Sequence, residues 1–193
     1  MGKSFDNAIA DHEYTMLQAH LYQCVHNSLT YLDVLNQRLG EYDYKHHLHH
    51  SISTTSLFCD SLDHAKDAVQ ELKRAADYIH KSTGAAEANR TMKQASNALA
   101  DLHQVAKAYD TRHSMSSKHN GIKATTSETV EWLVSTTRDA HFTGFARLQR
   151  QIIRVQTAIG EIEKPSIKTR AKEAVHNVTY KLDKIRAEHK SSP

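Results

Sequence analysis

Apolar residues recur every three or four positions along most of the chain. This spacing keeps side chains on one side of an α-helix, so each such run predicts an amphipathic helix. We find no run of alternating apolar and polar residues bounded by turn residues, the pattern typical of a β-strand with one buried face. The sequence therefore predicts an all-α protein with helices at residues 4–39, 47–81, 85–110, 127–163 and 166–189, and a flexible loop at 111–126.

The apolar positions form narrow seams rather than broad faces. Narrow seams that continue over several heptads favour helices packed nearly parallel to one another. We therefore expect one domain, residues 1–193, built as an elongated up-and-down helical bundle with coiled-coil-like seams. The seam of residues 85–110 shows the pattern most regularly, with Ala88, Met92, Ala95, Leu99, Leu102, Ala106 and Tyr109.

Glycine, proline and hydroxyl residues set the expected helix boundaries. Gly is common just past a helix end, so Gly40 and Gly84 are expected to follow the first two helices. Ser127 or Thr126 is expected to cap the start of the fourth helix, since a hydroxyl can accept from its free amides. Pro165 cannot continue the helical hydrogen bonds and ends that helix.

Composition narrows the class of protein. Of the 193 residues 39% are hydrophobic, yet no apolar run approaches the roughly 18 residues of a membrane span. The first residues contain no apolar stretch typical of a secretory signal. The two cysteines both fall within helical patterns, which suits a reducing compartment. We therefore expect a cytoplasmic protein, with export by a route that needs no cleaved signal left open.

Charge is distributed unevenly along the chain. Residues 144–190 hold 11 Lys and Arg against 5 Asp and Glu, a net +6, although the whole chain carries only +3. Three- and four-residue spacing places the basic residues of this segment in stripes on a helix face. The predicted anion-binding surface consists of Arg147, Arg150, Arg154, Lys164, Lys168 and Lys172.

Two interpretations of this basic surface stay open. A basic helix face can bind an acidic protein, anionic lipid headgroups or nucleic acid. It can also be a solvated face balanced by acidic neighbours within the molecule. Sequence-specific recognition of nucleic acid is not expected, because no recognised nucleic-acid motif or aromatic platform accompanies the charges. The available acidic neighbours are Asp60, Asp63, Asp67 and Glu71.

Histidine is unusually frequent, with 15 residues, and four of them lie between His46 and His50. If this segment is helical, His46 and His50 lie one turn apart and could chelate a divalent metal. Because no acidic or thiol ligand accompanies them locally, we expect weak metal binding at most.

A second candidate metal site follows from folding the first predicted helix onto the second. If the chain turns near Tyr42, Cys24 and Cys59 lie at the same height in the hairpin. Thiolate, imidazole and carboxylate groups are the usual ligands of tetrahedral zinc. The alternative, which we favour, is that both cysteines are small apolar residues of the seams, and no cofactor is expected. The candidate zinc ligands are His20, Cys24, Cys59 and either Asp63 or His64.

The segment from Arg170 to His176 offers a catalytic alternative. It resembles the signature of HEPN-type ribonucleases, all-helical enzymes in which an Arg and a His are separated by four to six residues. The resemblance implies that His176 would activate the ribose 2′-hydroxyl and that Arg170 would stabilise the transition state, in a cleft between two protomers. It covers seven residues of the chain.

The leading hypothesis is a non-catalytic helical scaffold or adaptor. Its expected partner is a second copy of the chain or another helical protein, because long apolar seams and a lopsided charge suit such contacts. The alternatives are the HEPN-like ribonuclease and a peripheral protein that binds anionic membranes through its basic C-terminal helices. For the leading hypothesis, contact with polyanions is expected to be weak.

Overall fold

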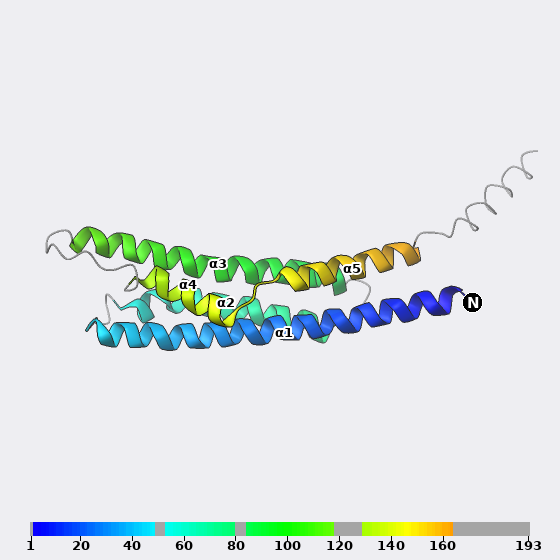
Figure 1. Ribbon diagram of the computed structural model, residues 1–193, viewed down its shortest axis with the longest axis horizontal. Coiled ribbons are helices and arrows are strands. Elements are labelled where there is room, and N and C mark those ends of the chain that lie inside the picture. The colour runs from blue at the N-terminus through cyan, green and yellow to red at the C-terminus, as the bar shows by residue number, and fades with distance from the viewer. Residues whose placement is uncertain (1, 49–52, 80–83, 118–128, 164–193) are drawn as a thin grey trace, which may run out of the picture.

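The computed structural model describes residues 2–48, 53–79, 84–117 and 129–163, which form five α-helices and no β-strand. These helices lie side by side in an elongated bundle (Figure 1), so the predicted all-α bundle is confirmed. Within these ranges no helix is long and apolar enough to cross a membrane. The helices are α1 (Gly2–Lys45), α2 (Thr54–Asp77), α3 (Gly84–Ser117), α4 (Val130–His141) and α5 (Ala146–Glu163).

The bundle has four positions, and α4 and α5 share one of them. Both α1 and α3 pack against α2 on one side and against α4 and α5 on the other. The colours of Figure 1 show that α1 and α3 run in one direction along the bundle, while α2, α4 and α5 run in the other. As a consequence, α2 and α5 lie across the bundle from one another and run in the same direction.

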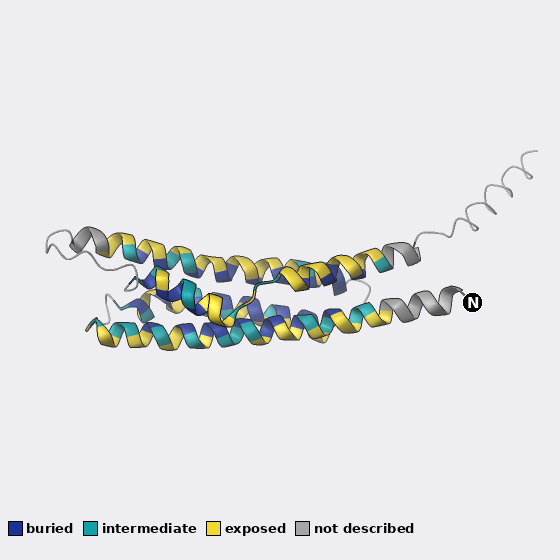
Figure 2. Cartoon of the chain, viewed as in Figure 1, coloured by how far each residue is buried: buried dark blue, intermediate teal, exposed yellow. Residues whose placement is uncertain are grey.

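Each helix turns a buried stripe toward the axis of the bundle (Figure 2), and most residues of this stripe are apolar. In α1 the stripe consists mainly of leucines that are fully buried, and in α3 it consists mainly of alanines. Small side chains on α3 allow its neighbours to approach closely, which extends dispersion contacts along the bundle. Most of the predicted seam positions that the structure describes are thus buried, but Cys59 of the second seam is exposed, so the prediction that both cysteines are buried seam residues is wrong for Cys59. The largest fully buried side chains include Tyr31, Phe58, Leu17, Leu21, Leu35, Leu72 and Leu102.

The predicted end of the first helix at residue 39 is wrong, because α1 continues through Gly40 to Lys45. A glycine inside a helix costs about 1 kcal/mol relative to alanine. Burial of Leu39 on one side of Gly40, and contacts of Asp43 with α2 on the other, offset this cost. The second helix accordingly begins at Thr54 rather than at residue 47, and it ends at Asp77.

Carboxylates from the ends of α1 and α3 cap the helices that follow them. Asp43 accepts hydrogen bonds from the amides of Thr54 (2.7 Å) and Thr55 (2.9 Å), and also from their hydroxyls (2.7 and 2.5 Å). Asp110 accepts from the amides of Val130 (3.0 Å) and Glu131 (2.7 Å). These bonds satisfy amides that a helix start leaves free, and they place a negative charge at the positive end of the helix dipole.

The same short motif, Tyr-Asp-x-x-His, carries both capping aspartates. Tyr42 packs on His46 with ring centroids 4.2 Å apart, and Tyr109 packs on His113 at 3.9 Å. This repeat is not among the motifs predicted from the sequence. It closes both helical hairpins at the same end of the bundle, the end opposite the N-terminus (Figure 1).

The predicted single helix at 127–163 is also wrong, because residues 142–145 divide it into α4 and α5. Thr129 caps α4 by accepting from the amide of Trp132, so the predicted capping residues, 126 and 127, are replaced by a later one. At the break, Gly144 has φ +78°, a left-handed conformation that glycine adopts at little cost. The ring of Phe142 lies edge-on to Phe145, with centroids 5.0 Å apart, so the break is itself packed.

The third helix is longer than predicted, since α3 extends past residue 110 to Ser117. It therefore takes up the first part of the predicted loop 111–126. The remainder of that loop, residues 118–126, lies outside the described residues, as does the predicted helix 166–189.

Candidate functional site

The buried residues of α5 determine which face of this helix points into the bundle. Leu148, Ile152 and Val155 are buried in the apolar core. Gln151 is also buried, and its amide nitrogen donates to the carbonyl oxygen of Glu13 (3.1 Å) and to its carboxylate (2.6 Å). A buried polar group with its hydrogen bonds made disfavours other rotations of the helix, because rotation would leave that group unpaired.

The outer face of α5 presents the predicted arginine stripe to solvent. Arg147, Arg150 and Arg154 are all exposed, and none of them forms an ion pair with a residue that the structure describes. Arg150 donates only to the carbonyl oxygen of Ala146 within its own helix (3.3 Å). Ile153 lies in the same stretch with 54% of its surface exposed. The other half of the predicted surface, Lys164, Lys168 and Lys172, lies outside the described residues.

The acidic residues of α2 do not neutralise this stripe. Asp60, Asp63 and Asp67 are exposed, and within the described part of the chain no ion pair joins them to a basic residue. Glu71 pairs with Arg74 of its own helix instead. Because α2 and α5 lie across the bundle from one another, the expected internal charge balance is not found. The molecule carries a basic and an acidic stripe on opposite sides.

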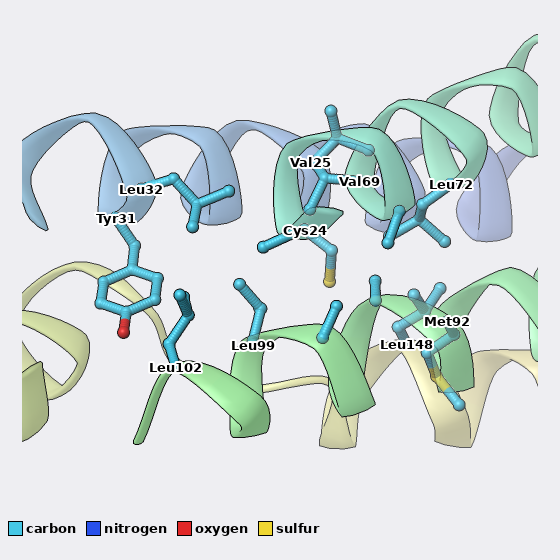
Figure 3. Close-up of a cluster of buried hydrophobic side chains, with 14 of the residues drawn as sticks. Cys24, Val25, Tyr31, Leu32, Val69, Leu72, Met92, Leu99, Leu102 and Leu148 are labelled. Atoms are coloured by element: carbon cyan, nitrogen blue, oxygen red, sulfur yellow. The ribbon is translucent and has the colours of Figure 1, made fainter. Parts of the chain in front are cut away.

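Cys24 belongs to the apolar core. It is buried in the cluster that contains Val25, Val69 and Leu72 (Figure 3). Burial raises the pKa of its thiol to about 11, so the thiol is protonated at neutral pH. Because metals bind the thiolate, this environment opposes coordination.

The structure does not assemble the five candidate zinc ligands. The amide of Gln18 donates to the carbonyl oxygen of Ala76 (2.9 Å), which places Cys24 near the height of Leu72. Cys59 lies about 20 Å further along α2 at 1.5 Å per residue, exposed, with its sulfur 4.0 Å from a carboxylate oxygen of Asp63.

The predicted register was wrong because the chain turns after Lys45 rather than near Tyr42. His20 and His64 complete no site either. Among the described residues, no three His, Cys, Asp or Glu side chains are grouped so that they could hold a metal ion.

We expect the two cysteines to respond differently to substitution. Cys24→Ser lowers the free energy of unfolding by about 1–2 kcal/mol, because it buries a hydroxyl in an apolar cluster. Cys59→Ser, the matched exposed control, changes it by less than about 0.5 kcal/mol. Denaturant titrations with and without a zinc chelator test this. If the chelator lowers the stability of the wild type but of neither variant, the cysteines hold a metal ion, and the apolar role of Cys24 is contradicted.

His46 and His47, the described histidines of the cluster, lie in a turn after α1 and do not begin a helix. His46 follows the end of α1 and packs on Tyr42, while His50 lies outside the described residues. His46 instead borders a shallow hollow of about 190 Å³ between the end of α1 and the start of α4. Sequence reasoning missed this hollow, because it depends on the extension of α1 past Gly40. Its lining residues are Arg38, Glu41, Tyr42, Lys45, His46, Thr129, Trp132 and Leu133.

A Ser–His–Glu arrangement joins α3 to α4 and was also missed. Nε2 of His103 lies 3.2 Å from a carboxylate oxygen of Glu131, and Nδ1 lies 3.5 Å from the hydroxyl of Ser135. These residue types serve nucleophilic catalysis when the serine–histidine bond is about 2.6–3.2 Å long. Here that contact is longer, and Glu131 and Ser135 lie on a different side of α4 from the hollow. We interpret the arrangement as a surface contact that ties the two helices together.

The residues of the HEPN-like alternative, Arg170 and His176, lie outside the described residues. No family model, curated protein or solved structure matches the chain. Of the predicted sites, the outer face of α5 is the one whose described residues, Arg147, Arg150 and Arg154, lie exposed together on one helix.

Proposed function

We propose that this protein is a non-catalytic helical scaffold that assembles with copies of itself through the outer face of α5. The observation that supports this most directly is the exposure of Ile153, beside three arginines that are not neutralised within the described structure. Arginine and apolar side chains together are typical of protein interfaces, in which a desolvated centre is surrounded by a polar rim.

The two kinds of side chain contribute differently to such a contact. An exposed ion pair contributes only about 0–1 kcal/mol, so the arginines mainly orient and accelerate the encounter. Full burial of an isoleucine contributes about 1.5–3 kcal/mol, of which Ile153 has roughly half left to gain. We therefore expect weak assembly that requires micromolar or higher concentrations.

Light scattering at low salt tests the proposal. We expect an average mass above the 21.8 kDa of one chain, rising with protein concentration and falling with salt. Reversing Arg147, Arg150 and Arg154 to Glu abolishes the increase. Ile153→Ser weakens the association about tenfold or less, because roughly 1 kcal/mol of apolar burial is lost. The matched control reverses the same number of charges on α3, at the exposed residues Lys93, Lys107 and Arg112.

The same preparations distinguish the alternatives. A mass of one chain at every concentration contradicts the proposal. Salt-resistant binding to anionic vesicles favours the peripheral membrane protein instead, because apolar insertion is not screened by salt. RNA cleavage that disappears in both Arg170→Ala and His176→Ala, with the bundle intact, favours the ribonuclease.

A further inference from the structure

We infer that the surface on which α5 docks is the acidic stripe of α2, formed by Asp60, Asp63 and Asp67, on a second copy of the chain. This inference rests on the proposed self-assembly and names its complementary face. Both stripes are exposed, and neither is neutralised by an ion pair in the described structure. Complementary charge is what selects partner and register at such contacts.

The two stripes have the same spacing along their helices. The aspartates are separated by three and then four residues, and the arginines are separated in the same order. At 1.5 Å per residue, both stripes place their charges at intervals of about 4.5 and 6 Å. Two parallel helices therefore bring all three pairs together in one register. An antiparallel arrangement reverses one spacing and misaligns the middle pair.

The fold supplies this parallel direction. Within one molecule α2 and α5 run the same way, so a neighbour shifted without rotation presents its α2 parallel to α5. The two stripes face opposite sides of the bundle, so one molecule cannot pair its own stripes. A contact between two different surfaces that does not close on itself produces an open chain of molecules.

The positions of the two stripes also determine how far one molecule is displaced along the bundle axis relative to the next. Lys66 pairs with Asp33 (3.7 Å), which places the acidic stripe near that residue of α1. Gln151 bonds Glu13, which places the arginine stripe near the N-terminal third of α1. Asp33 and Glu13 are separated along α1 by about 30 Å at 1.5 Å per residue. Successive molecules are therefore staggered along the bundle axis by about this distance.

The other charges near the acidic stripe leave it negative. Lys66 is engaged by Asp33 of α1, and Arg74 is engaged by Glu71. In the parallel register Ile153 lies against the part of α2 that contains Lys66, whose side chain is 38% exposed. The aliphatic stem of a lysine can cover an apolar neighbour while its ammonium stays in water.

Two neutral variants test the inference. One changes Arg147, Arg150 and Arg154 to Gln, and the other changes Asp60, Asp63 and Asp67 to Asn. At low salt, where the wild type forms assemblies that grow with concentration, we expect each variant alone to associate at least about tenfold more weakly. A 1:1 mixture of the two variants forms complexes of two chains and no larger ones. The arginine variant retains only the acidic stripe of α2, and the aspartate variant retains only the arginine stripe of α5. Neutralising Lys93, Lys107 and Arg112 to Gln is the matched control, and it leaves the growth unchanged.

Several outcomes overturn the inference, and they separate it from the proposed function. If the aspartate variant assembles like the wild type while the arginine variant does not, α5 docks on another surface and only the inference fails. A mixture that stays at the mass of one chain, or that grows beyond two chains, also excludes pairing of α2 with α5. If the wild type itself stays at the mass of one chain, the inference and the proposed function both fail. Thermal unfolding verifies that the variants are folded, since exposed substitutions usually shift stability by no more than about 0.5 kcal/mol.

Discussion

Replacing Asp43 by Asn lowers the free energy of unfolding by about 2 kcal/mol at pH 7, measured by denaturant titration. The carboxylate accepts four hydrogen bonds from Thr54 and Thr55 and so closes the hairpin between α1 and α2. Loss of a helix cap costs about 0.5–2 kcal/mol, and bonds to a charged acceptor are stronger than neutral ones. The amide of Asn retains one acceptor oxygen and cannot serve all four donors.

The effect of this substitution depends on pH. Burial tends to raise the pKa of Asp43, but hydrogen bonds from Thr55 and Thr54 outweigh it, and the pKa is lowered from its ordinary value. A carboxyl whose pKa is lower in the folded state contributes its full stability above the pKa of the unfolded chain. That contribution is lost as the pH falls through the folded value. We therefore expect the difference between wild type and Asp43→Asn to be largest above about pH 5 and to shrink below about pH 4.

The matched control is Asp101→Asn on the exposed side of α3, for which we expect a change below about 0.5 kcal/mol. A difference for Asp43→Asn that stays constant from pH 7 to pH 3 would show that the substitution acts through packing. The hydrogen bonds of the carboxylate would then not be the cause.

The helical seams were predictable because periodicity records which residues face a common core. Leu17, Leu21 and Leu35 follow this period, and all three are fully buried. Helix ends were less predictable, because a boundary is a balance between a local preference and tertiary contacts. Gly40 has the local preference of a helix end, but buried Leu39 and the capping bonds of Asp43 outweigh it.

One wrong helix boundary removed the candidate zinc site. Because the hairpin turns after Lys45, the heights of all residues on α2 shift relative to α1, and Cys24 faces Leu72 instead of Cys59. The arginine stripe was predictable, since it depends only on spacing within one helix. The acidic stripe lies on the opposite side of the bundle because of the order in which the helices pack. That order cannot be inferred from the spacing of residues within a single helix.

The Ser–His–Glu contact was unpredictable for a related reason. His103 lies on α3, whereas Glu131 and Ser135 lie on α4, and no local pattern indicates that these helices meet there. The repeated Tyr-Asp-x-x-His motif, by contrast, is visible in the sequence. Its role could not be inferred from sequence alone, because each aspartate caps a helix that begins after an intervening loop.

Replacing Tyr31 by Ala has the largest effect that we expect, a loss of about 4 kcal/mol in the free energy of unfolding. Tyr31 is fully buried in α1 and belongs to the core cluster with Leu32 and Leu102 (Figure 3). Its ring stacks on Phe142, with centroids 6.4 Å apart, at the break between α4 and α5. Removing a buried aromatic ring leaves a cavity that typically costs 3–5 kcal/mol.

Tyr31→Phe is the matched variant, because it keeps the ring and removes only the hydroxyl. That hydroxyl is buried and has no hydrogen-bond partner among the described residues, and burial raises the pKa of Tyr31. An unpaired buried hydroxyl destabilises a fold by about 1–3 kcal/mol. We therefore expect Tyr31→Phe to leave the free energy of unfolding unchanged or to raise it by about 1 kcal/mol. A loss of more than about 1 kcal/mol in Tyr31→Phe would show instead that the hydroxyl is hydrogen-bonded in solution and that this bond, in addition to the ring, holds α1 to the break.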